Sequence, residues 1–242
     1  MLKLIRGELY RILHKKSLYM YFGVLAFVYI LLAFMRSGGF NSESLVGDAS
    51  NLFFMTPAVV GGFFFSTIYT DDLNAKNLIT LAGYGLNKSK IVTAKIILAA
   101  LFSTVFFGVL PLFHSAVYMG FGCRATVEQL TVVYAVSLKY LLMTLAYISI
   151  SSVVVYAFQH STFAIVTYIL FSFGVIGNLL MMAAHTLNFK ISDHLISGIT
   201  DKIMTDILGG GVLLRPIIEY AAYLVISSIL ATMTFYKKEM EF

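Results

Sequence analysis

Six long apolar stretches constrain this chain more than any other feature of its sequence. They occupy residues 17–35, 51–69, 91–118, 129–158, 162–184 and 212–236. A helix rises about 1.5 Å per residue, so about 20 apolar residues cross the roughly 30 Å hydrocarbon core of a bilayer. Charged residues make up only 12% of the sequence, against about 25% in soluble chains. We therefore predict an all-α integral membrane protein with six transmembrane helices.

Breaks between and within these stretches follow from glycine and proline. Residues 36–50 contain Gly38, Gly39 and Asn41, which predicts a loop between the first two spans. Pro57 and the Gly61-Gly62 pair predict a kink or a close helix contact in the second span. The fifth span, 162–184, has Gly174, Gly177 and Asn178 along it.

The N-terminal residues 1–16 have the pattern of a basic amphipathic helix. Five apolar residues recur at helical spacing on one face: Leu2, Ile5, Leu9, Ile12 and Leu13. Arg6 and Arg11 fall on the other faces, so the helix can lie in the lipid headgroup layer as an elbow before a single six-span domain, 17–242. The alternative is the start of a cleaved signal peptide. The following apolar stretch is too long for that and lacks a clear cleavage site.

Residues 70–95 form the longest polar interruption on the basic side of the chain. Asp71 and Asp72 suit the first turn of a short helix, and Gly83 and Gly85 end it. The residues of this segment that could contact a partner protein are Asp71, Asp72, Leu73, Lys76, Leu78, Ile79 and Leu81. An ordinary solvated loop helix without a partner is the alternative.

The distribution of positive charge predicts the orientation in the membrane. A second amphipathic segment, 186–211, lies between the fifth and sixth spans and ends at Gly209-Gly210-Gly211. With the N-terminus inside, eleven Lys and Arg residues lie inside: Lys3, Arg6, Arg11, Lys15, Lys16, Lys76, Lys88, Lys90, Lys95, Lys237 and Lys238. Five lie outside: Arg36, Arg124, Lys190, Lys202 and Arg215. The positive-inside rule then places both termini in the cytoplasm, and the charge of +5 indicates no nucleic-acid partner.

One cation lies inside a predicted span. A charge such as Lys139 costs about 2.5–3.5 kcal/mol at mid-bilayer, so it should face protein or water. Glu219 enters the sixth span from the same side, and the two could form an intramembrane pair. Lys139 could instead extend its ammonium group towards the surface, or contact a substrate.

Several catalytic signatures are missing from the sequence. It contains no G-x-x-x-x-G-K-[ST], H-E-x-x-H or G-x-S-x-G motif and no T-V-G-Y-G filter. His114 and His160 have no ligand at metal-binding spacing, which favours hydrogen-bonded histidines near helix ends and predicts no metal site. The single cysteine, Cys123, excludes an intramolecular disulfide.

The order of these segments resembles the permease subunits of type-2 ATP-binding-cassette exporters. The closest stretch is 71–95. It contains the acidic pair Asp71-Asp72, a short helix, the break Gly83-Tyr84-Gly85, the turn Asn87-Lys88-Ser89-Lys90 and Lys95 at the start of the third span. The break lacks the proline often found there, and Lys88 stands where arginine is common. The resemblance implies a cytoplasmic coupling helix between spans 2 and 3 and an external amphipathic helix between spans 5 and 6.

The resemblance also implies the partners. A separate ATPase subunit, holding ATP and Mg, would dock on the cytoplasmic face, with Leu73, Leu78 and Ile79 inserted in its cleft. The elbow helix would bear against the same subunit and the membrane lipid. A second permease chain, identical or related, would complete the pathway in the plasma membrane. This chain would itself be non-catalytic, with no cofactor, and the cargo an antimicrobial peptide, a drug or a lipid.

Two other classes fit parts of the sequence. One is a six-span substrate-binding subunit or small secondary carrier, which would bind its substrate without a partner. The other is an intramembrane enzyme, which would lose activity on one polar substitution such as Lys139→Ala. No internal repeat was found, and this weighs against a self-contained secondary carrier.

Overall fold

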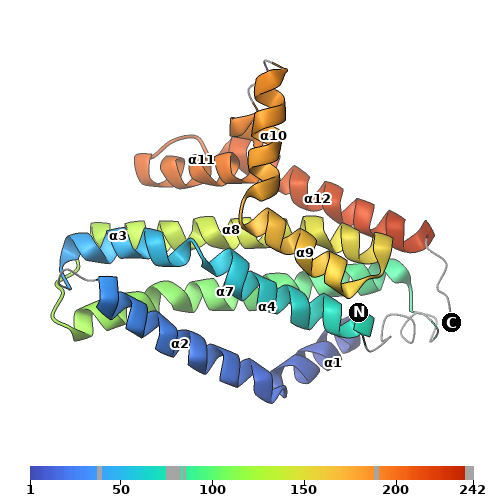
Figure 1. Cartoon of the computed structure of the whole chain (residues 1–242), viewed down its shortest axis with the longest axis horizontal. Coiled ribbons are helices and arrows are strands. Elements are labelled where there is room, and N and C mark those ends of the chain that lie inside the picture. Colours follow the sequence, from blue (N-terminus) through green and yellow to red (C-terminus); the bar gives the residue numbers. More distant parts are fainter. Residues whose placement is uncertain (37–39, 75–82, 84–85, 188–190, 238–242) are drawn as a thin grey trace.

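The computed structural model describes residues 1–36, 40–74, 83, 86–187 and 191–237. These residues form helices and contain no strand (Figure 1). In chain order the elements are α1 (Leu2–Leu13), α2 (Lys16–Arg36), α3 (Ser42–Phe53), η1 (Pro57–Gly61), α4 (Gly62–Phe65), η2 (Ser66–Thr70), α5 (Asp71–Asn74), α7 (Lys88–Gly120), α8 (Val127–Phe158), α9 (Ser161–Ser172), α10 (Val175–Thr186), η3 (Ser192–His194), α11 (Ile196–Gly209) and α12 (Leu214–Lys237).

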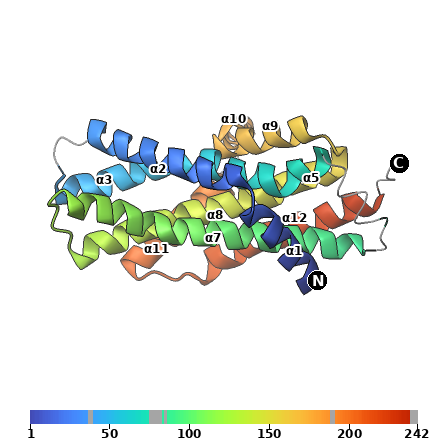
Figure 2. The same cartoon turned by 90° about the horizontal axis from the view of Figure 1, so that it is seen from below.

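Among the described residues, five helices are long and apolar enough to cross a membrane, and the bent pair α9–α10 raises the number to six if it counts as one span. The five are Lys16–Met35, Ser42–Leu73, Lys88–Gly120, Val127–Phe158 and Leu214–Lys237. They run along one common axis (Figure 2). The start of α7 and the end of α12 lie at one end of this axis, which we call the proximal end, and α1 lies beside the bundle near that end. The start of α8 and the start of α3 lie at the opposite, distal end.

The loop predicted for residues 36–50 is wrong from Ser42 onwards. A helix begins there because Asn41 and Ser44 form a reciprocal capping box, in which the side chain of each accepts from the backbone N–H of the other. One face of α3, which includes Leu45 and Ala49, is fully buried. The second span is therefore longer than predicted, and it continues from Ser42 to Leu73.

The close contact predicted near Pro57 and Gly61 is present. The chain widens into a π-helical turn at Pro57–Gly61, and the hydroxyl of Tyr168 on α9 donates to the freed carbonyl of Pro57. A Cβ on Gly61 would overlap the Tyr168 hydroxyl and lie 2.7 Å from the Thr144 Cγ2. Glycine at position 61 therefore lets the second span pack directly on α8 and α9.

Gly61→Ala is expected to lower the free energy of unfolding by about 1–3 kcal/mol, because overpacking forces the helices apart. Gly62→Ala is the matched control, since its Cβ would make an ordinary contact, 3.6 Å from Tyr168 Cε1. Denaturation of both variants in detergent measures the difference. Equal stability of the two variants would contradict this packing.

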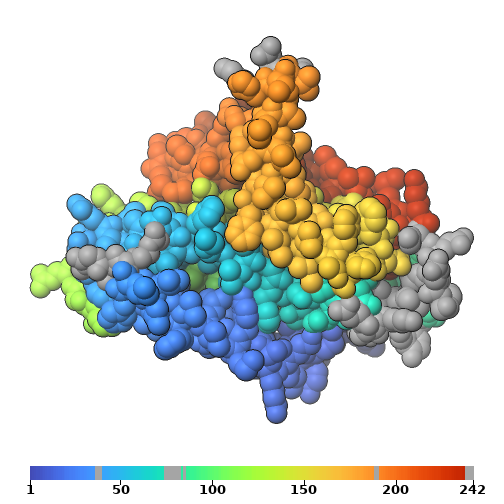
Figure 3. All heavy atoms as spheres, viewed as in Figure 1, coloured from blue at the N-terminus to red at the C-terminus, as the bar shows by residue number. Residues whose placement is uncertain are grey.

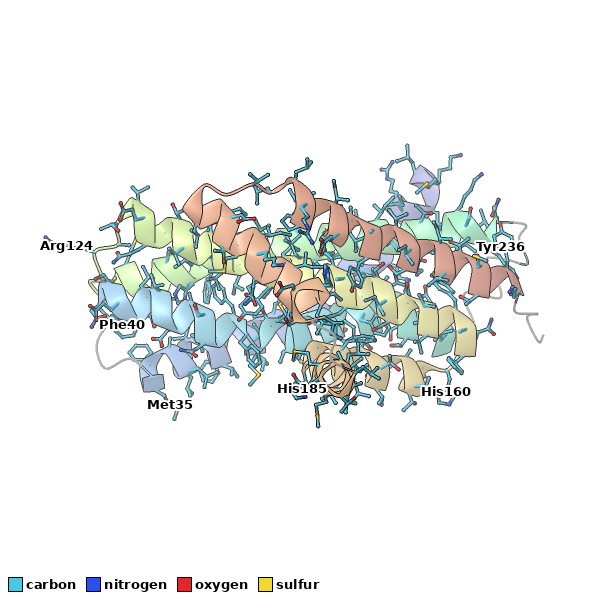
Figure 4. The ribbon with its side chains drawn as sticks, turned by 90° about the horizontal axis from the view of Figure 1, so that it is seen from above. Met35, Phe40, Arg124, His160, His185 and Tyr236 are labelled. Atoms are coloured by element: carbon cyan, nitrogen blue, oxygen red, sulfur yellow. The ribbon has the colours of Figure 1, made fainter. Side chains whose placement is uncertain are left out.

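The segment predicted as the fifth span, 162–184, is divided by a bend. α9 ends at Ser172, Gly174 adopts a left-handed conformation with φ of 72°, and α10 leaves at an angle of 62° to α9. α10 projects sideways from the bundle (Figures 1 and 3). In Figure 4, His185 near its end lies midway between Arg124 at the distal end and Tyr236 at the proximal end. The 12 residues of α9 reach only about 18 Å, which is less than the hydrocarbon thickness.

The amphipathic segment predicted between the last two spans forms the helix α11. Ile196, Ile199 and Ile203 are buried on its inner face, and it ends at Gly210, which has a φ of 69°. α11 packs along α8 and α12. The start of α12 does not reach the distal end of α8, since the Tyr220 hydroxyl donates to the carbonyl of Leu142 in the middle of α8. α11 lies between the start of α12 and the distal end (Figure 1).

His114 and His160 are hydrogen-bonded, as predicted. The His160 side chain caps α9 by accepting from the backbone N–H of Phe163. His114 is fully buried, and its Nε2 lies 2.8 Å from the Leu45 carbonyl oxygen. A carbonyl only accepts, so Nε2 carries the proton and Nδ1 accepts from the Tyr29 hydroxyl. This bond pattern ties α2, α3 and α7 together near the distal end.

Candidate functional site

A closed ring of four charged side chains joins three helices at the proximal end. We call Glu8, Arg11, Asp72 and Lys95 the charge ring. Arg11 Nη2 lies 2.6 Å from Glu8 Oε2 and 2.8 Å from Asp72 Oδ1. Lys95 Nζ lies 2.9 Å from Glu8 Oε2 and also pairs with Asp72. Each cation thus contacts both carboxylates, and each carboxylate contacts both cations.

The ring is largely withdrawn from solvent. The side chains of Asp72 and Lys95 are 0% and 2% exposed, and that of Glu8 is 11% exposed. The side chain of Arg11 is 29% exposed and forms the outer side of the ring. Isolated charges are costly to bury, whereas this arrangement pairs every one of them. The ring therefore fixes α1, the end of the second span and the start of α7 relative to one another.

The helix α1 brings two members of the ring into place. Its apolar residues Leu4, Ile5, Leu9 and Ile12 pack against the core, and Glu8 and Arg11 are three residues apart, so they share the adjoining face. The predicted apolar face included Leu2, which is 82% exposed, and did not include Leu4. Arg6 is exposed and lies outside the ring.

The electrostatics of the ring favour the ionised carboxylates. Burial by itself raises the pKa of Glu8, but the positive charges of Lys95 and Arg11 outweigh it and hold that pKa below its usual value. A depressed pKa means that Glu8 contributes stability at neutral pH, and that this contribution is lost as the pH falls through the lowered value.

A second ion pair lies beside the ring. Lys15 pairs with Asp71, and their side chains are 30% and 37% exposed. It connects the turn between α1 and α2 to α5. Because it is partly solvated, it contributes much less to stability than the ring does.

The sequence-predicted contact residues fall into three groups. Asp71 and Asp72 lie in the proximal ion pairs, and Leu73 packs partly buried against the core. Lys76, Leu78, Ile79 and Leu81 lie outside the described residues. Glu8 was missed, although it is the single acid in a basic helix, and that oddity is the signal that could have identified it.

The pair suggested between Lys139 and Glu219 is not formed. Lys139 Nζ lies 2.5 Å from Asp201 Oδ1 on α11. Glu219 instead pairs with Arg215, at 2.9 Å from its Nε, and with His194, at 3.2 Å from its Nδ1. The reason is α11, which packs along α8 and brings its own carboxylate to Lys139.

The ring is not arranged to hold a metal ion. The guanidinium group of Arg11 and the ammonium group of Lys95 occupy the space between its carboxylates. Among the described ranges, no group of three or more His, Cys, Asp or Glu side chains could hold a metal ion. The cysteine Cys123 is buried.

The long apolar helices define the class of this protein: it is all-helical and compatible with a multi-pass membrane protein. No protein-family model matches the chain, and no curated protein or solved structure matches it either.

Proposed function

We propose that this chain is the permease subunit of an ATP-binding-cassette exporter and forms half of a translocation pathway. The charge ring is the observation that carries the proposal. It joins α1 to both ends of residues 70–95, the stretch that resembles a coupling segment, because Asp72 lies on α5 near its start and Lys95 lies on α7 at its end. A force applied to this segment would reach three elements together.

The physical basis is the cost of separating buried charges. A buried charge that loses its partner is strongly destabilising, so the ring resists opening when a partner pushes on it. The first span follows α1 after a short turn, the second ends at the ring and the third begins there. Movement of the ring as a unit would therefore tilt three spans and open or close a pathway between two permease chains.

The remaining parts of the proposal follow from the resemblance and the charge count. The ATPase subunit binds ATP and Mg and docks at the proximal end, which is the basic and cytoplasmic end in the plasma membrane. A second permease chain faces this one. The cargo is an antimicrobial peptide, a drug or a lipid, and this chain is not itself an enzyme.

The proposal is tested by co-expression with an ATP-binding-cassette ATPase encoded next to this chain. We expect the two to co-purify at a fixed ratio, and ATP hydrolysis by the ATPase to change when the complex is reconstituted in lipid. Transport of cargo by the purified chain alone would refute the proposal.

A further inference from the structure

Two opposite sides of the bundle differ in charge. In Figure 1, α2 lies along the lower side, and α11 with the start of α12 lies along the upper side. Between Lys16 and Arg36 the sequence of α2 contains no charged residue, and its side chains Val24 and Phe27 are 58% and 67% exposed. Such a long, exposed apolar helix suits contact with lipid, so α2 marks the depth of the hydrocarbon core.

Contacts between neighbouring helices place Lys139 within this depth. The Ser137 hydroxyl donates to the carbonyl of Phe107 on α7 at 2.6 Å. The adjoining Phe106 stacks on Phe22 of α2. Phe22 lies about 9 Å from one end of α2 and about 21 Å from the other. Lys139 is two residues beyond Ser137 on α8, so it lies between the two boundaries that α2 marks.

Further charges lie on this side at a similar depth. Lys139 pairs with Asp201 of α11 at 2.5 Å, and the Asp201 side chain is 56% exposed. The Tyr220 hydroxyl donates to the carbonyl of Leu142, which lies about one turn from Lys139 on α8. The adjoining Glu219 and its ion pair with the exposed guanidinium group of α12 are therefore also within the depth of α2.

A polar hollow of about 460 Å³ lies on the outer side of α11, next to these charges. Its lining includes Ser192, Asp193, Ser197, Asp201, Lys202 and Asp206. Asp193 and Lys202 pair at 3.1 Å and remain 66% and 45% exposed. The stretch of α11 that lines the hollow, from Ser197 to Asp206, rises about 14 Å. The hollow thus has charges of both signs and hydroxyl groups, and α11 follows it from the level of Lys139 towards the distal end.

The polar lining does not continue on α12 towards the proximal end. There Val225, Ile229 and Met233 of α12 are 50–56% exposed, as on a face that contacts lipid. Water that reached the level of Lys139 along this side of the molecule would therefore enter from the distal end.

We infer that the polar side of α11 and the start of α12 line a water-filled cavity, which opens at the distal end and reaches the level of Lys139. Ionisable groups inside a membrane are costly against lipid, and they face protein or water and mark pathways. The inference rests on the proposed function in one respect: the cavity would be this chain's half of the translocation pathway. Entry of water requires no ATPase, so the cavity and the coupling can fail separately.

Single cysteines in a Cys123→Ser background provide the test. Ser197→Cys places a thiol on the hollow, at an exposed position. Val24→Cys is the matched control, because Val24 is exposed at a similar depth on the α2 side. Val127→Cys identifies the side of the membrane that the distal end faces. A charged, membrane-impermeant methanethiosulfonate is added to intact cells and to opened cells, and the remaining thiols are counted after solubilisation with a polyethylene-glycol maleimide that retards the chain on a gel.

We expect Ser197→Cys to react from the same side as Val127→Cys, and at least about tenfold faster than Val24→Cys, because a charged reagent is excluded from hydrocarbon. Thr205→Cys, which also lines the hollow, should react from that side too. Protection of both α11 cysteines in cells, with reaction of both in detergent, would overturn the inference, since lipid or protein would then cover this side. Equal rates for Ser197→Cys and Val24→Cys would also overturn it. An ATPase that fails to co-purify would refute the proposed coupling and leave these rates unchanged.

Discussion

Lys95→Met is expected to lower the free energy of unfolding by about 3–5 kcal/mol, the largest effect on stability that we predict. The side chain of Lys95 is 2% exposed and pairs with both Glu8 and Asp72. Its removal leaves two buried carboxylates with Arg11 as the ring's remaining cation. Denaturation of the purified chain in mixed micelles measures the loss.

Two further variants separate the ring from general effects of charge. Lys95→Met combined with Asp72→Leu removes one charge of each sign and should recover at least half of the lost stability, because Glu8 and Arg11 remain paired. Lys15→Met should cost less than about 1 kcal/mol, because its pair with Asp71 is partly solvated. If Lys95→Met and Lys15→Met cost the same, the ring does not hold the three helices together.

Leu78→Asp is expected to reduce ATP-driven transport by about 30-fold or more, which corresponds to the loss of an apolar anchor worth about 2 kcal/mol in the partner's cleft. Ile79→Asp should act in the same way. Both residues lie outside the described part of the chain, so this prediction depends on the sequence pattern and the resemblance. Transport is measured in vesicles that contain the chain and its ATPase.

The control for the coupling variants lies at the distal end of the molecule. Val127 begins α8 at the distal end and is 81% exposed, so Val127→Asp adds a charge without disturbing packing. We expect it to retain full transport. Full coupled transport in Leu78→Asp and Ile79→Asp would show that this segment does not receive force from the ATPase.

Much of the fold could be predicted from the sequence because lipid imposes a strong pattern on single segments. Long apolar stretches predict spans regardless of their neighbours, and Gly61 predicted a close helix contact. The helix at Ser42 was missed because glycine and asparagine favour a turn, whereas the capping box with Ser44 and the burial of Leu45 decide the outcome. The bend at Gly174 was missed because glycine is also common inside membrane helices.

The charge ring could be predicted only in part, because its partners are distant in the chain. Asp72 and Lys95 were each noted at the end of a span, but Glu8 is 87 residues from Lys95. Periodicity describes one helix at a time and does not pair helices. The same limit explains Lys139, whose partner Asp201 lies on a helix that had been assigned only an amphipathic character.

Labelling of single cysteines tests most directly whether residues 70–95 face the cytoplasm, where an ATPase could act on them. In a Cys123→Ser background the chain has no other thiol, so the maleimide can label only the cysteine introduced by Leu78→Cys or by Val127→Cys. We predict that a membrane-impermeant maleimide labels Val127→Cys in intact cells and labels Leu78→Cys only after the membrane is opened. Labelling of Leu78→Cys in intact cells would place the segment outside the cell and contradict the account.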